Sequence, residues 1–257
     1  MSVQDNLQDN TVTLPIADCS LCPFRGKTLL MGRCMPGDTC ITATSGRQID
    51  RFLRINPAYA EHYLHDPFWE RRAIAVRYAP QKTLLALVND EDEVVRRAVA
   101  YRLPTTQLNT LINDPDREVR MTVADRIPVE QLEQLADDAD YIVRLTVARR
   151  LPQGRLFRLI SDHDMAVRKV VAERLPEVSL ALMAHDEAPE VRRIIAERID
   201  PDEAVALLHD PDWVVRYTAV QRVPTDALRG FPDDPEPDVQ AAIAARLASP
   251  PQTPDTL

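Results

Sequence analysis

The chain has 257 residues, 45% of them hydrophobic, and a formal net charge of −9 at pH 7. Bulk binding to nucleic acid or to an anionic membrane needs an excess of Lys and Arg, so this charge argues against both. No stretch approaches the ~20 apolar residues of a membrane span, and residues 1–15 lack the basic and apolar parts of an export signal. We therefore expect a cytoplasmic protein, in a reducing compartment where clustered cysteines favour a metal over disulfides.

The only cysteines are four that lie close together near the N-terminus, after the polar residues 1–15, which we expect to be flexible. Two, eleven and five residues separate them. Four thiolates on so short a segment are suited to hold either an iron–sulfur cluster or zinc. The predicted metal ligands are Cys19, Cys22, Cys34 and Cys40.

Several features of this segment favour a [4Fe–4S] cluster over zinc. Structural zinc sites commonly pair cysteines that two to four residues separate, whereas five separate the second pair here. Arg25, Lys27 and Arg33 would offset the negative charge of a cluster, and four of the six glycines lie where their backbone N–H groups can be directed at sulfur. We therefore expect residues 16–50 to form an iron–sulfur domain. Zinc is the alternative, and disulfides or free thiols are a third.

A 24-residue unit governs the rest of the chain, and an Asp opens each of its eight copies. Its clearest copy, residues 114–128, reads Asp-Pro-Asp-Arg-Glu-Val-Arg-Met-Thr-Val-Ala-Asp-Arg-Ile-Pro. A fixed period of this length indicates stacked repeats, each of which packs on its neighbours. We expect eight repeats over residues 66–257, preceded by a degenerate capping repeat over residues 51–65. The opening residues are Asp66, Asp90, Asp114, Asp138, Asp162, Asp186, Asp210 and Asp234.

Within a repeat, with the opening Asp as position zero, the sequence predicts a long helix, a proline turn and a short helix. Asp is a strong N-cap, and the Pro that often follows it favours the first helical turn. The helix should run to position 13, because Pro at position 14 stops it. Apolar residues at positions 18 and 21 fit one short helix, of the α or 3₁₀ type. No segment alternates as a strand does, so the predicted fold is an all-α solenoid.

An arginine recurs at position 6, inside the apolar face of the long helix. At ~100° per residue, positions 5, 9 and 13 form a buried stripe, and position 6 lies within the same apolar arc. A charge placed there needs a partner, and the recurring candidate is the opening Asp of the same or the adjacent repeat. We predict an Arg–Asp ladder that fixes how repeats stack; the alternative is a row of ligands for phosphate or carboxylate. The ladder arginines are Arg72, Arg96, Arg120, Arg144, Arg168, Arg192 and Arg216.

A second arginine recurs at position 12, at the edge of the buried stripe, where a long side chain can reach solvent. These residues are the better candidates for contacts with a partner molecule. They are Arg102, Arg126, Arg150, Arg174, Arg198, Arg222 and Arg246.

The four cysteines, with Pro23 after the second, are followed by 24-residue units of the form Asp…Val-Arg…Ala…Arg-Leu-Pro, and this combination resembles the leucine-rich repeat variant family. The resemblance covers essentially the whole chain. It implies a [4Fe–4S] domain fused to a right-handed superhelix of alternating α- and 3₁₀-helices, and a link to nitrogen-fixing bacteria. The unit is also similar to HEAT-like repeats, in which Asp and Arg form stacked ladders.

Departures from the family's pattern occur in three repeats. Arg71 stands where the first repeat should have Val, and Asp200 replaces the Pro of the sixth. The last repeat has Gln240 for the ladder arginine, Ala248 and a Pro250-Pro251 tail. We expect the end repeats to act as caps and Asp200 to alter the local curvature.

The sequence has none of the motifs of phosphate-binding loops, dinucleotide-binding turns, serine hydrolases or zinc proteases. We therefore expect a non-enzymatic iron–sulfur protein whose helical-repeat surface binds another protein, with the cluster transferring one electron or sensing oxidation. One alternative is an interaction solenoid with a purely structural zinc or iron–sulfur cap. A third is nucleic-acid binding through the position-12 arginines, which the net charge disfavours.

Overall fold

The computed structural model describes residues 18–231 and 233–248. The N-terminal residues expected to be flexible, and the residues after Ala248, lie outside this range. The described residues form an all-α solenoid, in which the one β-type pairing is an isolated bridge between Met35 and Thr39. None of the described helices has the length and apolar character needed to cross a bilayer. The chain divides into two compact units between Ile127 and Pro128.

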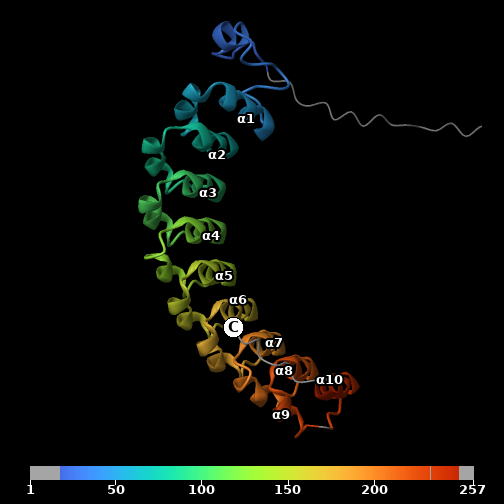
Figure 1. Cartoon of the computed structure of the whole chain (residues 1–257). Coiled ribbons are helices and arrows are strands. Elements are labelled where there is room, and N and C mark those ends of the chain that lie inside the picture. Colours follow the sequence, from blue (N-terminus) through green and yellow to red (C-terminus); the bar gives the residue numbers. More distant parts are fainter. Residues whose placement is uncertain (1–17, 232, 249–257) are drawn as a thin grey trace, which may run out of the picture. The chain divides into compact units, whose positions relative to one another are not determined.

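The first unit holds the cysteine segment (residues 18–45), the degenerate repeat and the first repeats. Its α-helices lie side by side (Figure 1), with α1 packed on α2, α2 on α3 and α3 on α4. Its elements are the π-helical turn η1 (Arg25–Leu29), α1 (Gly46–Ile55), η2 (Pro57–Tyr63), α2 (Trp69–Tyr78), η3 (Gln81–Leu87), α3 (Glu93–Arg102), η4 (Thr105–Leu111) and α4 (Arg117–Arg126).

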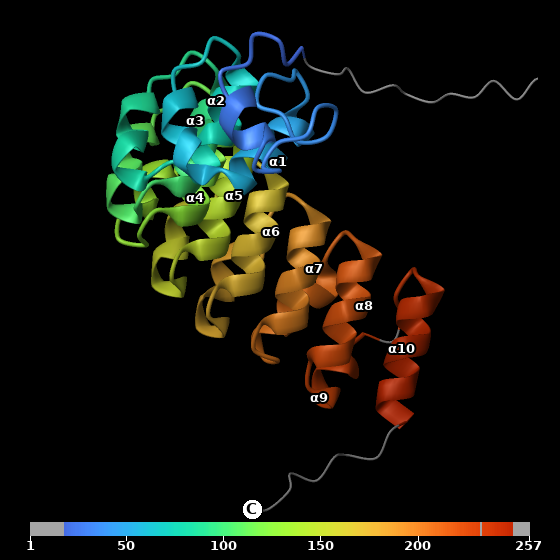
Figure 2. The same ribbon diagram turned by 90° about the horizontal axis from the view of Figure 1, so that it is seen from above.

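The second unit repeats the same arrangement, with α6, α7, α8 and α10 aligned side by side in Figure 2. Consecutive α-helices again pack on each other, and α10 packs on α8. Its elements are η5 (Leu132–Leu135), α5 (Tyr141–Arg150), η6 (Gln153–Leu159), α6 (Met165–Arg174), η7 (Glu177–Met183), α7 (Pro189–Arg198), η8 (Glu203–His209), α8 (Trp213–Arg222), α9 (Thr225–Leu228) and α10 (Pro237–Ala248).

The α-helices begin at position 3 of each repeat, later than predicted, because a second Asp at position 2 caps most of them. Asp92 accepts hydrogen bonds from the N–H groups of Val94 and Val95 at the start of α3. The carboxylate of the opening Asp90 instead accepts from the N–H of Asp92, at 3.0 Å. The prediction that the opening Asp is the N-cap was therefore wrong. The side chain of the opening Asp instead closes a turn just before the helix begins.

The short helices are 3₁₀-helices in most repeats, which is one of the two helix types that the sequence predicts. In η3, Leu84 and Leu87, three residues apart, are 0% and 3% exposed and so form its buried edge. Asp200 has a local effect: without Pro at that position, η8 starts at Glu203, two residues later in its repeat than the other seven-residue 3₁₀-helices do.

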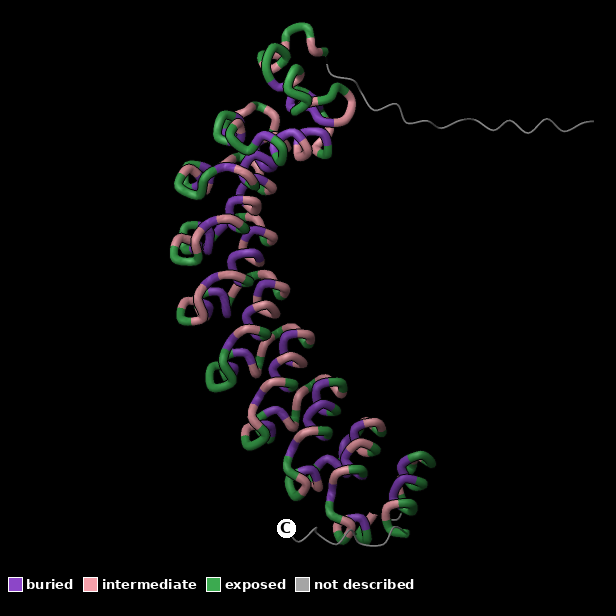
Figure 3. The backbone as a smooth tube through the Cα atoms, turned by 45° about the horizontal axis from the view of Figure 1, so that its top comes forward, coloured by how far each residue is buried: buried purple, intermediate pink, exposed green. Residues whose placement is uncertain are grey.

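The core runs along the stack as one stripe per α-helix, and Figure 3 shows the buried side of each helix turned into the stack. In α4, Val119 and Val123 are fully buried, as are Val167 and Val171 at the same positions in α6. The small Ala at position 10 is also buried in each of α3 to α7, which allows neighbouring helices to approach closely.

Six of the predicted ladder arginines join two repeats, and Arg120 donates to the backbone C=O of Asp114, the opening Asp of its own repeat. Nε and Nη2 of Arg144 donate to both carboxylate oxygens of Asp162, the opening Asp of the next repeat, each at 2.8 Å. Its Nη1 donates to the backbone C=O of Asp138, the opening Asp of its own repeat, at 2.7 Å. The same bidentate pairs join Arg72–Asp90, Arg96–Asp114, Arg168–Asp186, Arg192–Asp210 and Arg216–Asp234.

These pairs are largely withdrawn from water. The side chains of Arg96 and Asp114 are 11% and 3% exposed. Burial alone would raise the pKa of Asp162, but hydrogen bonds from Arg144 and from the N–H of Asp164 outweigh it and lower the pKa. The hydrogen bond from Arg216 likewise lowers the pKa of Asp234. Both carboxylates are thus held in the charged form that the arginines require.

Arg144→Met should lower the free energy of unfolding by roughly 3–5 kcal/mol, because it leaves the carboxylate of Asp162 buried without its partner. The double variant Arg144→Met/Asp162→Leu should recover part of this loss. Arg149→Met, an exposed site on the same helix, is the matched control. Urea denaturation measures all three, and an Arg144→Met protein within ~0.5 kcal/mol of wild type would contradict the ladder.

Acid should weaken the stack. An unfolded Asp has a pKa of ~3.9 and the paired Asp162 and Asp234 have lower values, so protonation favours the unfolded chain. Their contribution is therefore complete above about pH 5 and is lost as the pH falls through the folded pKa values. Urea denaturation across that range should show the fall, and a smaller one in Asp162→Asn. A free energy of unfolding that stays level from about pH 5 to about pH 2 would contradict this.

Candidate metal centre

The cysteine segment has a backbone of tight turns. The N–H of Cys22 donates to the C=O of Cys19 at 3.3 Å, and the N–H of Arg25 donates to the C=O of Cys22 at 3.2 Å. Gly32 and Gly37 have φ angles of 66° and 82°, which side chains with a Cβ rarely adopt. The first two cysteines therefore lie on successive turns. The two glycines allow further tight turns later in the segment.

An aromatic cluster holds this segment on the degenerate repeat. The ring of Phe24, two residues after Cys22, lies 5.8 Å from Phe52 of α1. It also lies 4.8 Å from Tyr59 and 6.3 Å from Tyr63, both of η2. Phe52 is 1% exposed and Tyr63 9%, so the cysteine segment shares a hydrophobic core with the first helices of the stack.

Hydrogen bonds add to this attachment. The N–H of Cys40 donates to the C=O of Gln48 at 3.2 Å, and the side-chain amide of Asn56 donates to the C=O of Arg33 at 2.9 Å. Arg51 of α1 forms an ion pair with Asp38. Contacts to α1 therefore flank the third and fourth cysteines, while Phe24 anchors the first two.

The pKa of the Cys19 thiol links the four predicted ligands. Burial raises this pKa, and the charges of Cys40, Cys22 and Cys34 raise it further, so each of these three thiols lies within electrostatic range of Cys19. The nearby Arg25 opposes this rise. Burial raises the pKa of Tyr63, Arg71 opposes that rise, and Cys22 adds to it, so this sulfur also lies near the aromatic cluster.

The donor set fits an iron–sulfur cluster in number and chemistry, because its four thiols are the ligands that such clusters take. None of the four cysteines is in a disulfide. In the described parts of the chain, no three His, Cys, Asp or Glu side chains are grouped as the ligands of a single metal ion. Cys40 is buried and the other three are partly exposed, which leaves one side of the group open to solvent.

The position-12 arginines have a role within the chain that the sequence analysis did not predict. Arg246 donates to the C=O groups of Val220 and Val223, at 2.6 and 2.8 Å, at the C-terminal end of the preceding α-helix. A positive charge there also suits the negative end of the helix dipole. Arg102, Arg126 and Arg198 make the same two bonds to the helix of the preceding repeat. Arg174 and Arg222 make one each, to the C=O groups of Ala148 and Ile199. Each is partly exposed, and contact with a partner molecule stays a prediction.

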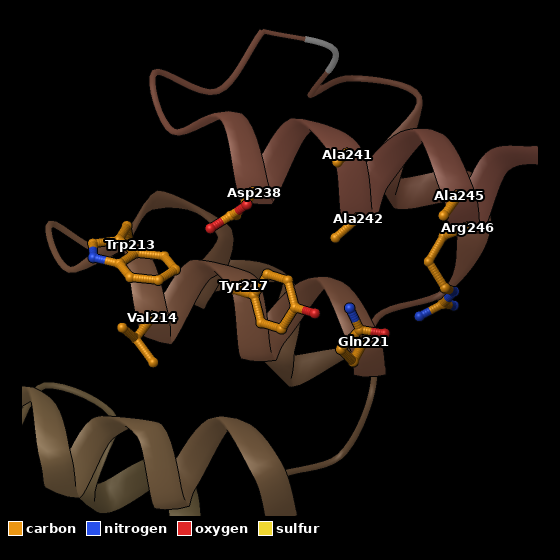
Figure 4. A pocket seen from close by; sticks show the side chains of 9 residues that line it. All are labelled: Trp213, Val214, Tyr217, Gln221, Asp238, Ala241, Ala242, Ala245 and Arg246. Carbon is orange, nitrogen blue, oxygen red and sulfur yellow. The ribbon is translucent and has the colours of Figure 1, made fainter.

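A groove of about 820 Å³ lies between α8 and α10. Figure 4 shows Trp213 and Tyr217 of α8 along one side and Ala241 and Ala245 of α10 along the other. The two alanines open the groove, since α7 carries Arg193 and Glu197 at the same repeat positions. Trp213 and Tyr217 are 42% and 39% exposed, so this part of the second unit presents aromatic surface.

Sequence reasoning missed two residues that shape the metal centre, Phe24 and Gln48. Nothing in the local sequence distinguishes Phe24 from any other turn residue beside a cysteine. Gln48 had a signal: α1 begins at Gly46 and Pro57 follows it as the Pro of position 14 follows later helices, so counting back from Pro57 places Gln48 at position 5, where later repeats have a buried Val.

Comparisons with known proteins bear on both parts of the chain. Residues 15–62 match the family described as "LRV protein FeS4 cluster", and residues 117–140 and 142–164 match "Leucine rich repeat variant". An "Uncharacterized 27.7 kDa protein in nifB 3'region" of Rhodobacter capsulatus is 38% identical over 87 residues, which are 34% of this chain and 35% of that protein. The match thus spans about a third of that relative.

A solved structure, "A leucine-rich repeat variant with a novel repetitive protein structural motif", is 61% identical and has a TM-score of 0.85. The alignment covers 90% of this chain and 99% of that one. Together with the family matches, it describes an iron–sulfur-binding segment joined to helical repeats. On this evidence the chain belongs to the leucine-rich repeat variant family.

Proposed function

We propose that this protein binds a [4Fe–4S] cluster through Cys19, Cys22, Cys34 and Cys40 and uses it to control the binding of another protein to its helical repeats. The single observation that supports this most is the core shared by the cysteine segment and α1. Phe24 packs on Phe52, so a change at the cysteines acts on the first helix of the stack.

The contacts continue from α1 into the repeats. Asp50 of α1 accepts a hydrogen bond from the hydroxyl of Tyr78 in α2, at 2.9 Å. Arg71 of α2 reaches back to the C=O of Ala43 at 3.3 Å and pairs with Asp66. The ladder begins at the next residue, where Arg72 pairs with Asp90. Direct contacts thus connect the cysteine segment, through α1 and α2, to the first ladder pair. They give a displacement of the segment a physical route to that pair.

A bound cluster of this kind supplies one-electron chemistry. The four cysteines hold it, and Arg25 offsets the negative charge near Cys19. The aromatic rings of Phe24 and Tyr63 exclude water from the buried side, while the partly exposed cysteines leave the other side accessible to an oxidant or reductant. We expect the protein to act in the cytoplasm and to have no catalytic activity.

A structural cap is the second candidate, favoured by what the segment covers. Ile49 and Leu53 of α1 are fully buried, although no complete repeat precedes this helix. A stack must cover its first apolar face, and Ile41 and Ala43 contribute buried side chains on that side. This geometry suits both the structural cap and the proposed redox control of binding, which we call the sensor. The two differ only in whether the cluster changes its oxidation state reversibly. Nucleic-acid binding has less support, because the position-12 guanidinium groups donate to backbone carbonyls and the net charge is −9.

Protein purified without oxygen should contain about four iron and four sulfide ions per chain and absorb broadly near ~400 nm, because four thiolates ligate a [4Fe–4S] cluster. Cys34→Ser should lose the absorbance, while Met35→Ala, at the exposed neighbouring residue, should keep it. Iron, sulfide and zinc analysis measures this. Stoichiometric zinc without labile sulfide would refute the cluster.

Loss of the cluster should loosen the first repeats, Asp66 to Pro104, more than the later ones, because the cysteine segment covers α1 and contacts α2. Hydrogen exchange on the reduced, oxidised and cluster-free protein measures this. The sensor predicts that the reduced and oxidised forms differ in these repeats. If those two forms exchange alike and only the cluster-free form loosens, the sensor is wrong and the structural cap stands.

A further inference from the structure

Gln48 is a buried side chain without a partner. It is 2% exposed, and neither its Oε1 nor its Nε2 atom has a hydrogen bond. Among the described residues, the other buried unpaired side-chain atoms are single atoms of Arg71, Gln131 and Arg222. Nearly all buried amides in folded proteins are paired, so a whole amide left unpaired indicates an acceptor or donor that belongs to the complete site.

The repeat register shows which way the Gln48 face of α1 is turned. Counted back from Pro57 as position 14, Gln48 occupies position 5, the place of the buried Val95 in α3. In α2 this position is Arg71, whose Nη2 donates to the C=O of Ala43, on the N-terminal side of α2 in the cysteine segment. Position 5 therefore faces the N-terminal neighbour, and the N-terminal neighbour of α1 is the cysteine segment.

Two contacts agree with this direction. Phe52, four residues after Gln48 and on the same helix face, lies 5.8 Å from Phe24 of the cysteine segment. The backbone C=O of Gln48 accepts the N–H of Cys40, at 3.2 Å. Gln48 is thus held directly against the fourth cysteine, which is itself 7% exposed.

An amide at this position is unfavourable unless it binds something. Val or Leu would fill the same space without burying unpaired polar atoms. The chemistry brought to this face is sulfur, and an N–H group that donates to a ligand sulfur stabilises the more negative, reduced state of an iron–sulfur cluster. The Oε1 atom cannot serve this purpose, because it only accepts hydrogen bonds.

We infer that Nε2 of Gln48 donates a hydrogen bond to a sulfur atom of the bound cluster or its thiolate ligands, and so raises the cluster's reduction potential. Gln48 is a positioning residue in this role, acting on the ligands of the metal. The inference rests on the proposed function, since it needs an iron–sulfur cluster to be present.

The test uses the full chain with its cluster. Gln48→Leu keeps the volume but removes the donor, so the midpoint potential should become more negative. Gln48→Glu, measured at a pH high enough to ionise the buried carboxyl, adds a negative charge and should shift the potential further in the same direction. Gln131→Leu, which changes a Gln in the second unit that also has an unpaired buried atom, is the matched control and should leave the potential unchanged.

Resonance Raman spectra provide a second measurement that does not require the cluster to change oxidation state. Exchange into deuterium oxide should shift the iron–sulfur stretching bands of the wild type more than those of Gln48→Leu, because one N–H···S bond is missing in the variant. A merely structural Gln48 would move neither the potential nor this isotope shift.

The outcomes separate the two proposals. A chain without labile sulfide would overturn the proposed function and this inference with it. A normal iron and sulfide content, with the potential and isotope shift of Gln48→Leu and Gln48→Glu equal to those of the wild type, would overturn the inference alone. If Gln48→Leu does not retain its cluster, Gln48→Glu decides by the same two measurements.

Discussion

The bidentate ion pair between an arginine of one repeat and the opening Asp of the next is the interaction on which the stack depends. One edge of the Arg144 guanidinium donates hydrogen bonds to both carboxylate oxygens of Asp162, and Nη1 donates to the backbone C=O of Asp138. A planar group held on both edges permits one relative placement of the two repeats. A buried pair of this kind adds little net stability compared with apolar residues, but removing one partner is costly. Its role is therefore to specify register, which accounts for a 24-residue spacing with no insertions.

The two ends of the array show what happens where this interaction stops. At the N-terminal end, α1 has Ile49 where the repeats have their ladder arginine, and the cysteine segment covers its buried side. At the C-terminal end, Gln240 replaces the arginine and donates to the C=O of its own opening Asp234, at 2.5 Å. Leu247, at a position that is buried in earlier repeats, is 40% exposed. The cysteine segment thus covers the first helix of the array, at its N-terminal end.

Much of this architecture follows from period and residue type. Pro at position 14 separates a long helix from a short one, and an arginine within an apolar arc needs a carboxylate. The helix start was misplaced because both Asp90 and Asp92 are good caps, and only the geometry shows that Asp90 is already bound to Arg72. The role of the position-12 arginines depends on the C-terminal carbonyls of a neighbouring helix, and no local pattern encodes their proximity.

The metal centre, too, could be predicted from the sequence only in part. The cysteine spacing predicts the ligands, but Phe24 and Gln48 matter only because α1 packs against the segment, a long-range contact that the sequence does not display.

The central claim is that the cluster lies against α1 and η2. Paramagnetic NMR tests it directly, because unpaired electrons broaden the signals of nearby nuclei. Signals of Gln48, Phe52 and Tyr63 should broaden in the paramagnetic form while those of α3 stay sharp; sharp signals throughout α1 and η2 would contradict the account.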